Sequence, residues 1–234
     1  MARADPHCHT FASDGMVTPA ELVQAAVDAK LDLIAVTDHD TMRSVRETQE
    51  RGNAAGLAVV GGQEITTRWP AQTHMLAWFL EKPVRSGMSL ADTVAAIHDQ
   101  GGMAIVPHPF MPVYFGSIQP QMLRRLIERH PVEGIEMVFT VPIGARRRRV
   151  LDAFYDANQQ RLGAKIGGSD SHFGTHDIAL AVTDYEGDFR TAIQTRATTP
   201  HRLPGNRSAP IGIFLRQQWR SLVELPFRRL RGEL

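Results

Sequence analysis

Short apolar runs alternate with helix-like segments along most of this 234-residue chain. Seven strands are predicted, the first at residues 5–9 around the sequence His-Cys-His and the others at the short apolar runs of residues 31–36, 57–60, 73–79, 103–106, 134–138 and 164–168. Apolar residues at helical spacing predict the helices, which follow the caps Thr18 and Ser89 and cover residues 42–55, 121–129 and 146–160. This alternation is typical of a mainly parallel sheet with right-handed crossovers. We therefore expect an α/β fold with a single barrel-like domain.

The end of the chain departs from this alternation. We expect the barrel to cover residues 1–199 and a linker with an appendage to cover residues 200–234. The appendage has an apolar stripe at helical spacing, made up of Leu215, Trp219, Leu222 and Val223. Arginines lie beside this stripe, so the pattern predicts a basic amphipathic helix. It favours packing on the barrel or on a second subunit, with peripheral contact to an anionic membrane as the alternative.

Composition limits the class of protein without naming its chemistry. With 43% hydrophobic and 22% charged residues, the chain resembles ordinary globular proteins. The formal charge of +1 does not single out nucleic acid or a membrane as a partner, so no stable nucleic-acid partner is indicated. A single cysteine excludes an intramolecular disulfide, and the first residues lack the apolar stretch of a signal peptide. We therefore expect a cytoplasmic protein.

Histidine and carboxylate side chains recur where the predicted strands end. Five of them directly follow apolar runs, namely His39, Glu64, His108, Asp170 and His172. Three more lie within predicted strands near the same edge, namely His7, His9 and His74. Asp14 stands in the turn-like sequence Ser-Asp-Gly that follows the first strand. Because the carboxyl ends of barrel strands meet on one face, we expect these nine side chains to share one pocket.

Nine such groups exceed the needs of one metal ion. Mixed imidazole and carboxylate ligands suit Zn, Mn or Fe, and carboxylates commonly bridge ions. Two or three neighbouring ions fit the hydrolysis of phosphate esters, because one ion activates water while the others neutralise phosphoryl and leaving-group oxygens. The pattern therefore predicts a phosphatase or phosphodiesterase that uses a metal-activated hydroxide on a small phosphorylated substrate.

The ordered motifs resemble the polymerase and histidinol phosphatase (PHP) family. They are His-x-His-Thr with Ser-Asp-Gly, then Thr-Asp-His-Asp-Thr, Gly-x-Glu, His-Pro and Asp-x-His, spread over residues 5 to about 199. The resemblance implies a distorted seven-stranded, TIM-like (β/α)7 barrel with a trinuclear metal centre at its rim. It assigns His7, His9, Glu64 and Asp170 to the first ion. It assigns Glu64 (as a bridge), His74 and His108 to the second ion, and Asp14, His39 and His172 to the third.

The resemblance also bears on the substrate. Asp14 stands where some family members have histidine, and the aspartate version resembles the branch that acts on nucleotides and short RNA. Larger members of that branch carry a long insertion between the positions of Glu64 and His108, where this chain has only 43 residues. We therefore expect the substrate lid to be reduced or built from another part of the chain.

Further residues are candidates for catalysis or substrate binding. Glu64 and Asp170 are the expected catalytic carboxylates, and Asp38 either transfers protons or caps the end of its strand. Because a phosphate needs cationic partners, Arg43, Arg68 and Lys165 near strand ends are candidates for substrate binding. His176, which follows the last motif, is either a substrate contact or an ordinary loop residue.

Two alternative functions remain open at this point. An amidohydrolase-type deaminase or hydrolase also uses His-x-His on a first strand and a late aspartate, although Glu64, rather than a lysine, is the expected bridge here. A metal-stabilised binding module without activity is the other alternative, and the complete ligand set argues against it. Nucleotides, short oligonucleotides, histidinol phosphate and other phosphates all remain candidate substrates.

Overall fold

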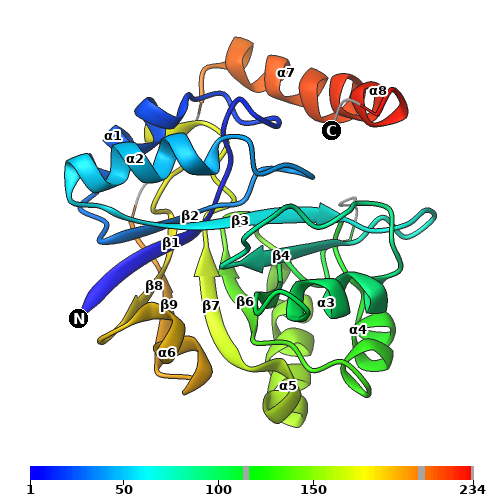
Figure 1. The fold of residues 1–234 in the computed structure, drawn as a ribbon. Helices are drawn as coiled ribbons and strands as arrows, with labels where there is room; N and C mark the ends of the chain where they lie inside the picture. Colours follow the sequence, from blue (N-terminus) through cyan, green and yellow to red (C-terminus); the bar gives the residue numbers. More distant parts are fainter. Residues whose placement is uncertain (113–115, 205–208, 233–234) are drawn as a thin grey trace.

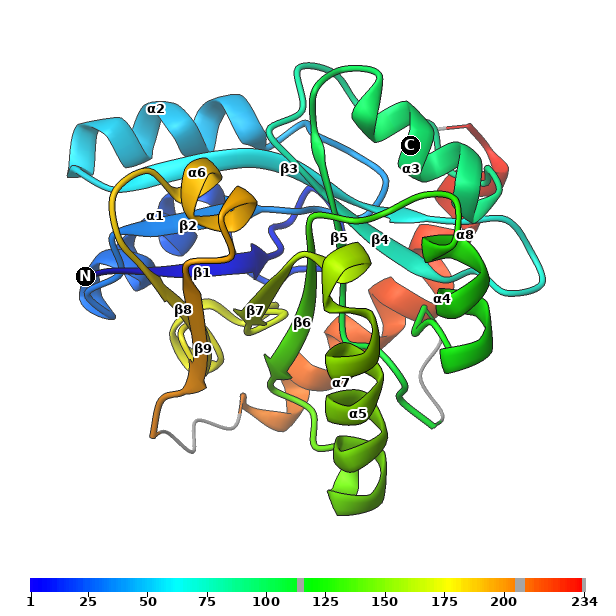
Figure 2. The same ribbon diagram turned by 90° about the horizontal axis from the view of Figure 1, so that it is seen from below.

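A nearly closed, barrel-shaped sheet organises the molecule (Figures 1 and 2). The structure is a computed structural model that describes residues 1–112, 116–204 and 209–232. The strands in these ranges are β1 (Ala2–Cys8), β2 (Leu33–Val36), β3 (Ala58–Thr66), β4 (His74–Trp78), β5 (Met103–Val106), β6 (Gly134–Phe139), β7 (Ala164–Gly168), β8 (Ala181–Tyr185) and β9 (Thr198–Arg202). Their order across the sheet is β7-β6-β5-β4-β3-β2-β1-β8-β9. The α/β barrel class is therefore confirmed, with nine strands in the described ranges instead of the expected seven.

Parallel pairing, as expected, joins β1 to β2, β2 to β3, β5 to β6 and β6 to β7. The exceptions are β4, which runs antiparallel to both β3 and β5, and β8, which runs antiparallel to β1 and β9. Only seven residues separate Thr66 at the end of β3 from His74 at the start of β4. A parallel crossover needs a dozen or more residues, so this connection permits only a hairpin. The reversal places His74 opposite Thr66, at the same rim as the end of β3.

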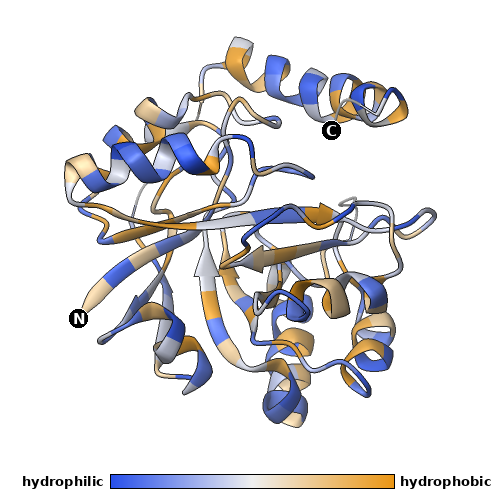
Figure 3. Ribbon diagram, in the orientation of Figure 1, coloured by the Kyte–Doolittle hydropathy of each residue, from blue (hydrophilic) through white to orange (hydrophobic). Residues whose placement is uncertain are grey.

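Helices cover the outside of the sheet. They are α1 (Pro19–Asp28), α2 (Val45–Ala55), α3 (Leu90–His98), α4 (Pro120–Ile127), α5 (Gly144–Leu162), the 3-10 turn η1 (Gly174–His176), α6 (Phe189–Gln194), α7 (Ile211–Trp219), the π-helical turn η2 (Arg220–Glu224) and α8 (Leu225–Leu230). In Figure 3 the outer helices alternate hydrophobic and hydrophilic residues, as expected for helices with one buried face. Among the described residues, no helix combines the length and apolarity that crossing a bilayer requires.

Local sequence signals explain most element boundaries. The Thr18 hydroxyl accepts a hydrogen bond from the backbone N–H of Glu21, whose side chain accepts one from the Thr18 N–H in return. Gly56 ends α2 in the left-handed conformation that glycine adopts readily. Strands β8 and β9 have no counterpart in the sequence prediction, because Thr183 and Asp184 interrupt one and the other lacks an apolar run. The boundary expected after residue 199 falls inside β9, and part of the expected linker lies outside the described residues.

The appendage forms a nearly continuous helical segment, α7-η2-α8, across the top of the molecule in Figure 1. Its predicted stripe does not face the barrel, since Leu215, Trp219 and Leu222 are each about 60% exposed. The face turned to the barrel instead carries Gln217 and Leu225, both buried. This face turns to the barrel because polar groups on the barrel rim bond it, as in the hydrogen bond from Gln217 to Asp14. Contact of the exposed stripe with an anionic membrane stays a prediction.

Candidate metal centre

Strand β1 places two imidazoles on one face of the sheet. His7 lies in β1 and His9 just beyond its end, and both are fully buried. Their Nε2 atoms lie 3.1 Å apart, whereas Cys8 between them packs into a hydrophobic cluster on the opposite face. This is the alternation that an extended strand imposes on successive side chains.

Glu64 of β3 lies at the centre of the histidines. Its Oε1 is 2.9 Å from His74 Nδ1 and 3.0 Å from His108 Nε2. Its Oε2 lies 3.2–3.4 Å from nitrogen atoms of three further imidazoles, those of His7, His9 and His39. Burial would raise the pKa of Glu64, but the surrounding histidines outweigh it and hold the pKa well below its usual value. Glu64 is therefore an ionised carboxylate with imidazoles on both oxygens.

Asp170 completes a first group of possible ligands. Its Oδ1 lies 3.2 Å from Nε2 of both His7 and His9. The ligand atoms of His7, His9, Glu64 and Asp170 all lie within 4.8 Å of one another. These are the four side chains that the family resemblance assigns to one ion.

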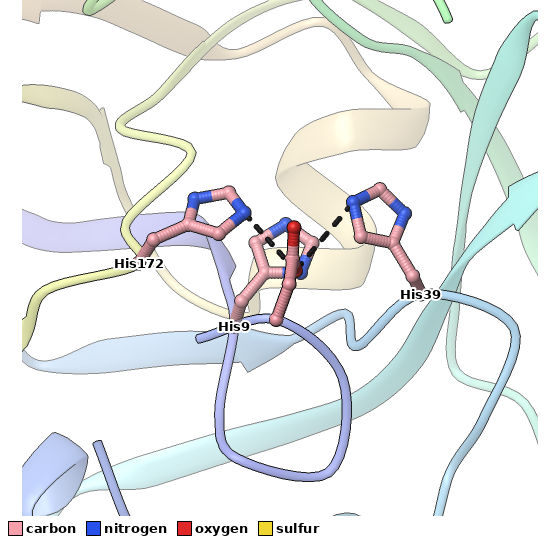
Figure 4. A group of neighbouring side chains, drawn as sticks. His9, His39 and His172 are labelled. Atoms are coloured by element: carbon pink, nitrogen blue, oxygen red, sulfur yellow. Dashed lines mark ion pairs between the residues drawn. The ribbon is translucent and has the colours of Figure 1, made fainter. Parts of the chain in front are cut away.

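Asp14 brings together a second group. Its Oδ1 is 3.3 Å from His172 Nε2, 3.8 Å from His39 Nε2 and 3.9 Å from His9 Nδ1. Figure 4 shows His172 and His39 turned towards the centre from opposite sides, with His9 between them and ion pairs dashed. A third group consists of His39, Glu64 and His74. The nine side chains expected from the sequence thus form one cluster, with His108 joined to it through Glu64.

The charges of this cluster favour a bound cation. Burial opposes a charge on His172, but Asp14 and Asp170 outweigh it and raise the pKa of His172 to about 10. Burial lowers the pKa of His39 to about 3. Burial would raise the pKa of Asp14, yet His172 and His39 hold it well below its usual value. The carboxylates therefore stay ionised in a buried site and attract positive charge.

The nitrogen and oxygen atoms of these side chains are better placed to bind metal ions than to form hydrogen bonds with one another. Among the described residues, His9 Nδ1, Asp14 Oδ1 and His39 Nδ1 are buried without a hydrogen-bond partner. Nitrogen and oxygen atoms 3.2–3.9 Å apart can share an ion that each contacts at about 2.1 Å. The buried clusters are thus consistent with several metal sites of mixed nitrogen and oxygen ligands.

Two carboxylates that the sequence analysis did not single out accept hydrogen bonds from the ligand residues or their neighbours. Glu136 of β6 accepts hydrogen bonds from His7 Nδ1 at 2.9 Å and from the backbone N–H of His108 at 2.6 Å. Asp177 accepts the backbone N–H of His172 at 2.6 Å and the Ser171 hydroxyl at 2.7 Å. A lone glutamate inside the apolar run at residues 134–138 is the signal that points to Glu136.

Asp38 is buried beneath the loop that carries Asp14. Its carboxylate accepts hydrogen bonds from Thr10 N, Thr10 Oγ1 and Ser13 Oγ at 2.6–2.7 Å, and also from the Ser44 hydroxyl. Four donors on one carboxylate favour an anchoring role for Asp38 over the alternative of proton transfer. Its catalytic role stays a prediction.

The expected substrate-binding residues make different contacts in the structure. Lys165 places its ammonium 4.7 Å from the centre of the Tyr155 ring. Arg43 lines a separate cavity of about 750 Å³ beside the start of α2, and the Arg68 backbone N–H bonds Met88 O. A second cavity, of about 570 Å³, is lined by His108, Asp170 and His172. Arg43, Arg68, Lys165 and His176 are not among the described residues that line this second cavity, so their role in substrate binding stays a prediction.

The chain matches a known protein family over most of its length. The PHP domain model matches residues 5–184 of the chain. The chain belongs to the PHP family. A crystal structure from Bacteroides vulgatus, of a two-domain protein described as containing a predicted PHP-like metal-dependent phosphoesterase, matches with a TM-score of 0.67. The match has 21% identity and covers 94% of this chain and 69% of that chain, which shows a shared fold.

Two curated relatives of this PHP protein are named as an exoribonuclease and a nucleoside bisphosphate phosphatase. The 5′-3′ exoribonuclease Rnm of Salmonella typhimurium is 33% identical over 115 residues, which are 42% of this chain and 39% of the relative. The 3′,5′-nucleoside bisphosphate phosphatase of Chromobacterium violaceum is 33% identical over 73 residues, 31% of this chain and 26% of the relative. The chain thus spans well under half the length of both relatives. As a PHP protein with these clusters, it is a hydrolase of the metal-dependent phosphoesterase type.

Proposed function

We propose that this PHP protein hydrolyses phosphate esters of nucleotides or short oligonucleotides, using two or three divalent ions held by the nine clustered side chains. One observation carries the proposal. In each of three His, Asp and Glu groups the ligand atoms lie within 4.8 Å of one another, and Glu64 belongs to two of these groups. The named activities of the two curated relatives support nucleotides as the substrate class.

The protein's own residues orient the ligands for this chemistry. Glu136 accepts the Nδ1 hydrogen of His7, which turns the Nε2 lone pair towards Glu64 and Asp170. His172 Nδ1 lies 2.8 Å from the backbone oxygen of Asp170, so its Nε2 faces Asp14. When bound, the ions would supply activation of a water molecule and neutralisation of phosphoryl charge. Burial of these groups excludes bulk water and strengthens every charge interaction in the cluster.

A phosphatase panel tests the proposal. Protein loaded separately with Zn, Mn or Fe is offered mononucleotides, 3′,5′-bisphosphates, oligoribonucleotides and histidinol phosphate. We expect at least one metal form to release phosphate or nucleotide from the first three classes, and chelation to abolish the release. Turnover of histidinol phosphate alone would contradict the nucleotide assignment.

The same panel, extended with amides and cyclic ureides, separates the alternative functions. Hydrolysis of amides or cyclic ureides with phosphate esters untouched would favour an amidohydrolase-type enzyme. The central position of Glu64, where a lysine would serve in that alternative, argues against this outcome. Ligand binding without turnover under every metal would favour a non-catalytic module.

A further inference from the structure

The second cavity lies between the metal centre and the C-terminal helical segment. It has a volume of about 570 Å³, within the range of small-molecule sites. Asp170 and His172 of the metal centre line it together with Phe214 and Gln217 of α7. A substrate phosphate at the metal centre would therefore place its organic part against α7.

Helix α7 is held over the loop of Asp14 by specific polar contacts. The Gln217 side chain is buried, and its Nε2 donates a hydrogen bond to Asp14 Oδ2 at 3.1 Å. Arg220, one turn further on, donates to the backbone oxygens of Phe11 and Ser13 at 2.9 and 2.6 Å. Its guanidinium also lies 5.2 Å from the centre of the Phe11 ring. These contacts fix α7 relative to the metal centre.

The cavity is lined mainly by uncharged and aromatic groups. The ring of Phe214 on α7 lies 6.4 Å from that of Phe173, at an angle of 33°. Phe139 and Leu180 complete an apolar wall, and Gln218 adds an amide. Among the described lining residues there is no lysine or arginine. This chemistry fits a planar, uncharged ring with a polar edge better than a second anionic group.

We propose that α7 is the specificity element of this enzyme, with Phe214 and Phe173 binding an uncharged aromatic ring in the organic part of the phosphate ester. The proposal rests on the proposed function for the position of the phosphate. Helix α7 then takes the place of the lid that the short segment between Glu64 and His108 lacks room to build. Gln217 is a positioning residue in this arrangement, because it acts on substrate through Asp14.

A pair of substrates isolates the contribution of the ring. Adenosine 5′-monophosphate and ribose 5-phosphate share the same primary 5′-oxygen as leaving group and differ in the base. We expect the wild-type enzyme to prefer the nucleotide in kcat/KM. Phe214→Ala should reduce that preference by at least about fivefold, as expected from loss of stacking on one base. Phe214→Trp should retain it.

Leu215→Ala is the matched control, since Leu215 is the neighbouring residue on α7 and is 60% exposed. It should leave the ratio of the two kcat/KM values unchanged. An equal fall for both substrates in Phe214→Ala, or a wild-type enzyme without preference, overturns the proposal.

Calorimetric titration with adenosine, which carries no phosphate, separates the two proposals. We expect the metal-loaded wild type and Leu215→Ala to bind adenosine, and Phe214→Ala to bind it at least about fivefold more weakly. If adenosine binds with this pattern but no phosphate ester is hydrolysed, the proposed function is refuted and the proposed ring site is supported. Hydrolysis of the nucleotide without detectable adenosine binding would sink the ring site alone.

Discussion

At the residue scale, the metal centre depends on groups that orient the ligands as much as on the ligands. The sequence predicted which nine side chains meet, because most of them lie near or after the ends of neighbouring strands, and the hairpin of β3 and β4 brings His74 to the same rim. The sequence motifs did not single out Glu136, Asp177 or Gln217 as partners. Glu136 and Gln217 act through contacts between residues far apart in the chain, whereas Asp177 is only five residues from His172 but lies outside every motif. Gln217 is 203 residues away from Asp14 in the chain.

Glu136→Ala tests the support behind His7. The change removes the acceptor of His7 Nδ1 and of the His108 backbone N–H. We expect metal affinity and kcat/KM to fall about 10- to 100-fold, the usual effect of losing such a partner. Glu136→Gln, which keeps an acceptor oxygen, should lie between the wild type and the alanine variant. Metal titration and steady-state kinetics measure both effects, and equal values for all three proteins would exclude the orienting role.

Gln217→Leu tests the contact between α7 and Asp14. Without the hydrogen bond to Asp14 Oδ2, we expect weaker metal binding by the group of Asp14, His39 and His172, by about 10-fold or more. The two other ligand groups should keep their affinity. Gln24→Leu, on the exposed surface of α1, is the matched control. Metal stoichiometry at increasing chelator concentration distinguishes one weakened site from a general loss, and an unchanged profile would refute the role.

At the element scale, periodicity predicted the strands that carry the site, and it failed where elements are short or polar. All seven expected strands are present, and six of them contain a short apolar run, whereas the first was expected from the His-x-His pattern of residues 5–9. The antiparallel direction of β4 could have been predicted from the length of its connection to β3, because seven residues are too few for a parallel crossover. Helix α7 buries Gln217 and exposes Leu215 and Trp219, which is the reverse of what its apolar stripe predicts. Hydrophobic periodicity alone therefore could not predict which face of α7 turns to the barrel.

Helix α3 is tied to the sheet by a pair that responds to pH. His98 Nε2 lies 3.1 Å from Glu133 Oε2, which also accepts the backbone N–H of Ala104 at the start of β5. The hydrogen bond from His98 to Glu133 raises the pKa of His98 above its usual value of 6.5. A raised histidine pKa adds stability that is fully present below 6.5 and is lost as pH rises through the folded-state pKa.

His98→Asn should therefore destabilise the protein more at pH 5.5 than at pH 9. Because His98 is about one-third exposed, solvent screening limits the difference in the free energy of unfolding to about 0.5 kcal/mol. Urea unfolding of wild type and variant at both pH values measures it, and the comparison cancels titration elsewhere in the chain. A variant that is equally destabilised at both pH values would rule out the charged pair.

At the scale of the whole molecule, a nearly closed sheet gathers residues separated by 165 positions, from His7 to His172, at one rim. Strand β7, at one end of the sheet, and the residues after it close against β1 and β8, where Cys8 pairs with Ser171 and where Thr183 bonds Gly167. The C-terminal segment then crosses this rim and borders its cavity (Figure 1). On the two proposals made above, the barrel would supply the metal ligands and α7 would contact the substrate.

The central claim is that the cluster around Glu64 is a metal-dependent phosphoesterase centre. The most direct test measures kcat/KM for a phosphate ester and metal content in the same preparations of wild type and Glu64→Gln. Glu133→Gln, a carboxylate outside the cluster, serves as the control. We expect Glu64→Gln to lose bound metal and more than about 100-fold in kcat/KM, with the control close to wild type. Wild-type turnover by Glu64→Gln with its full metal content would contradict the account.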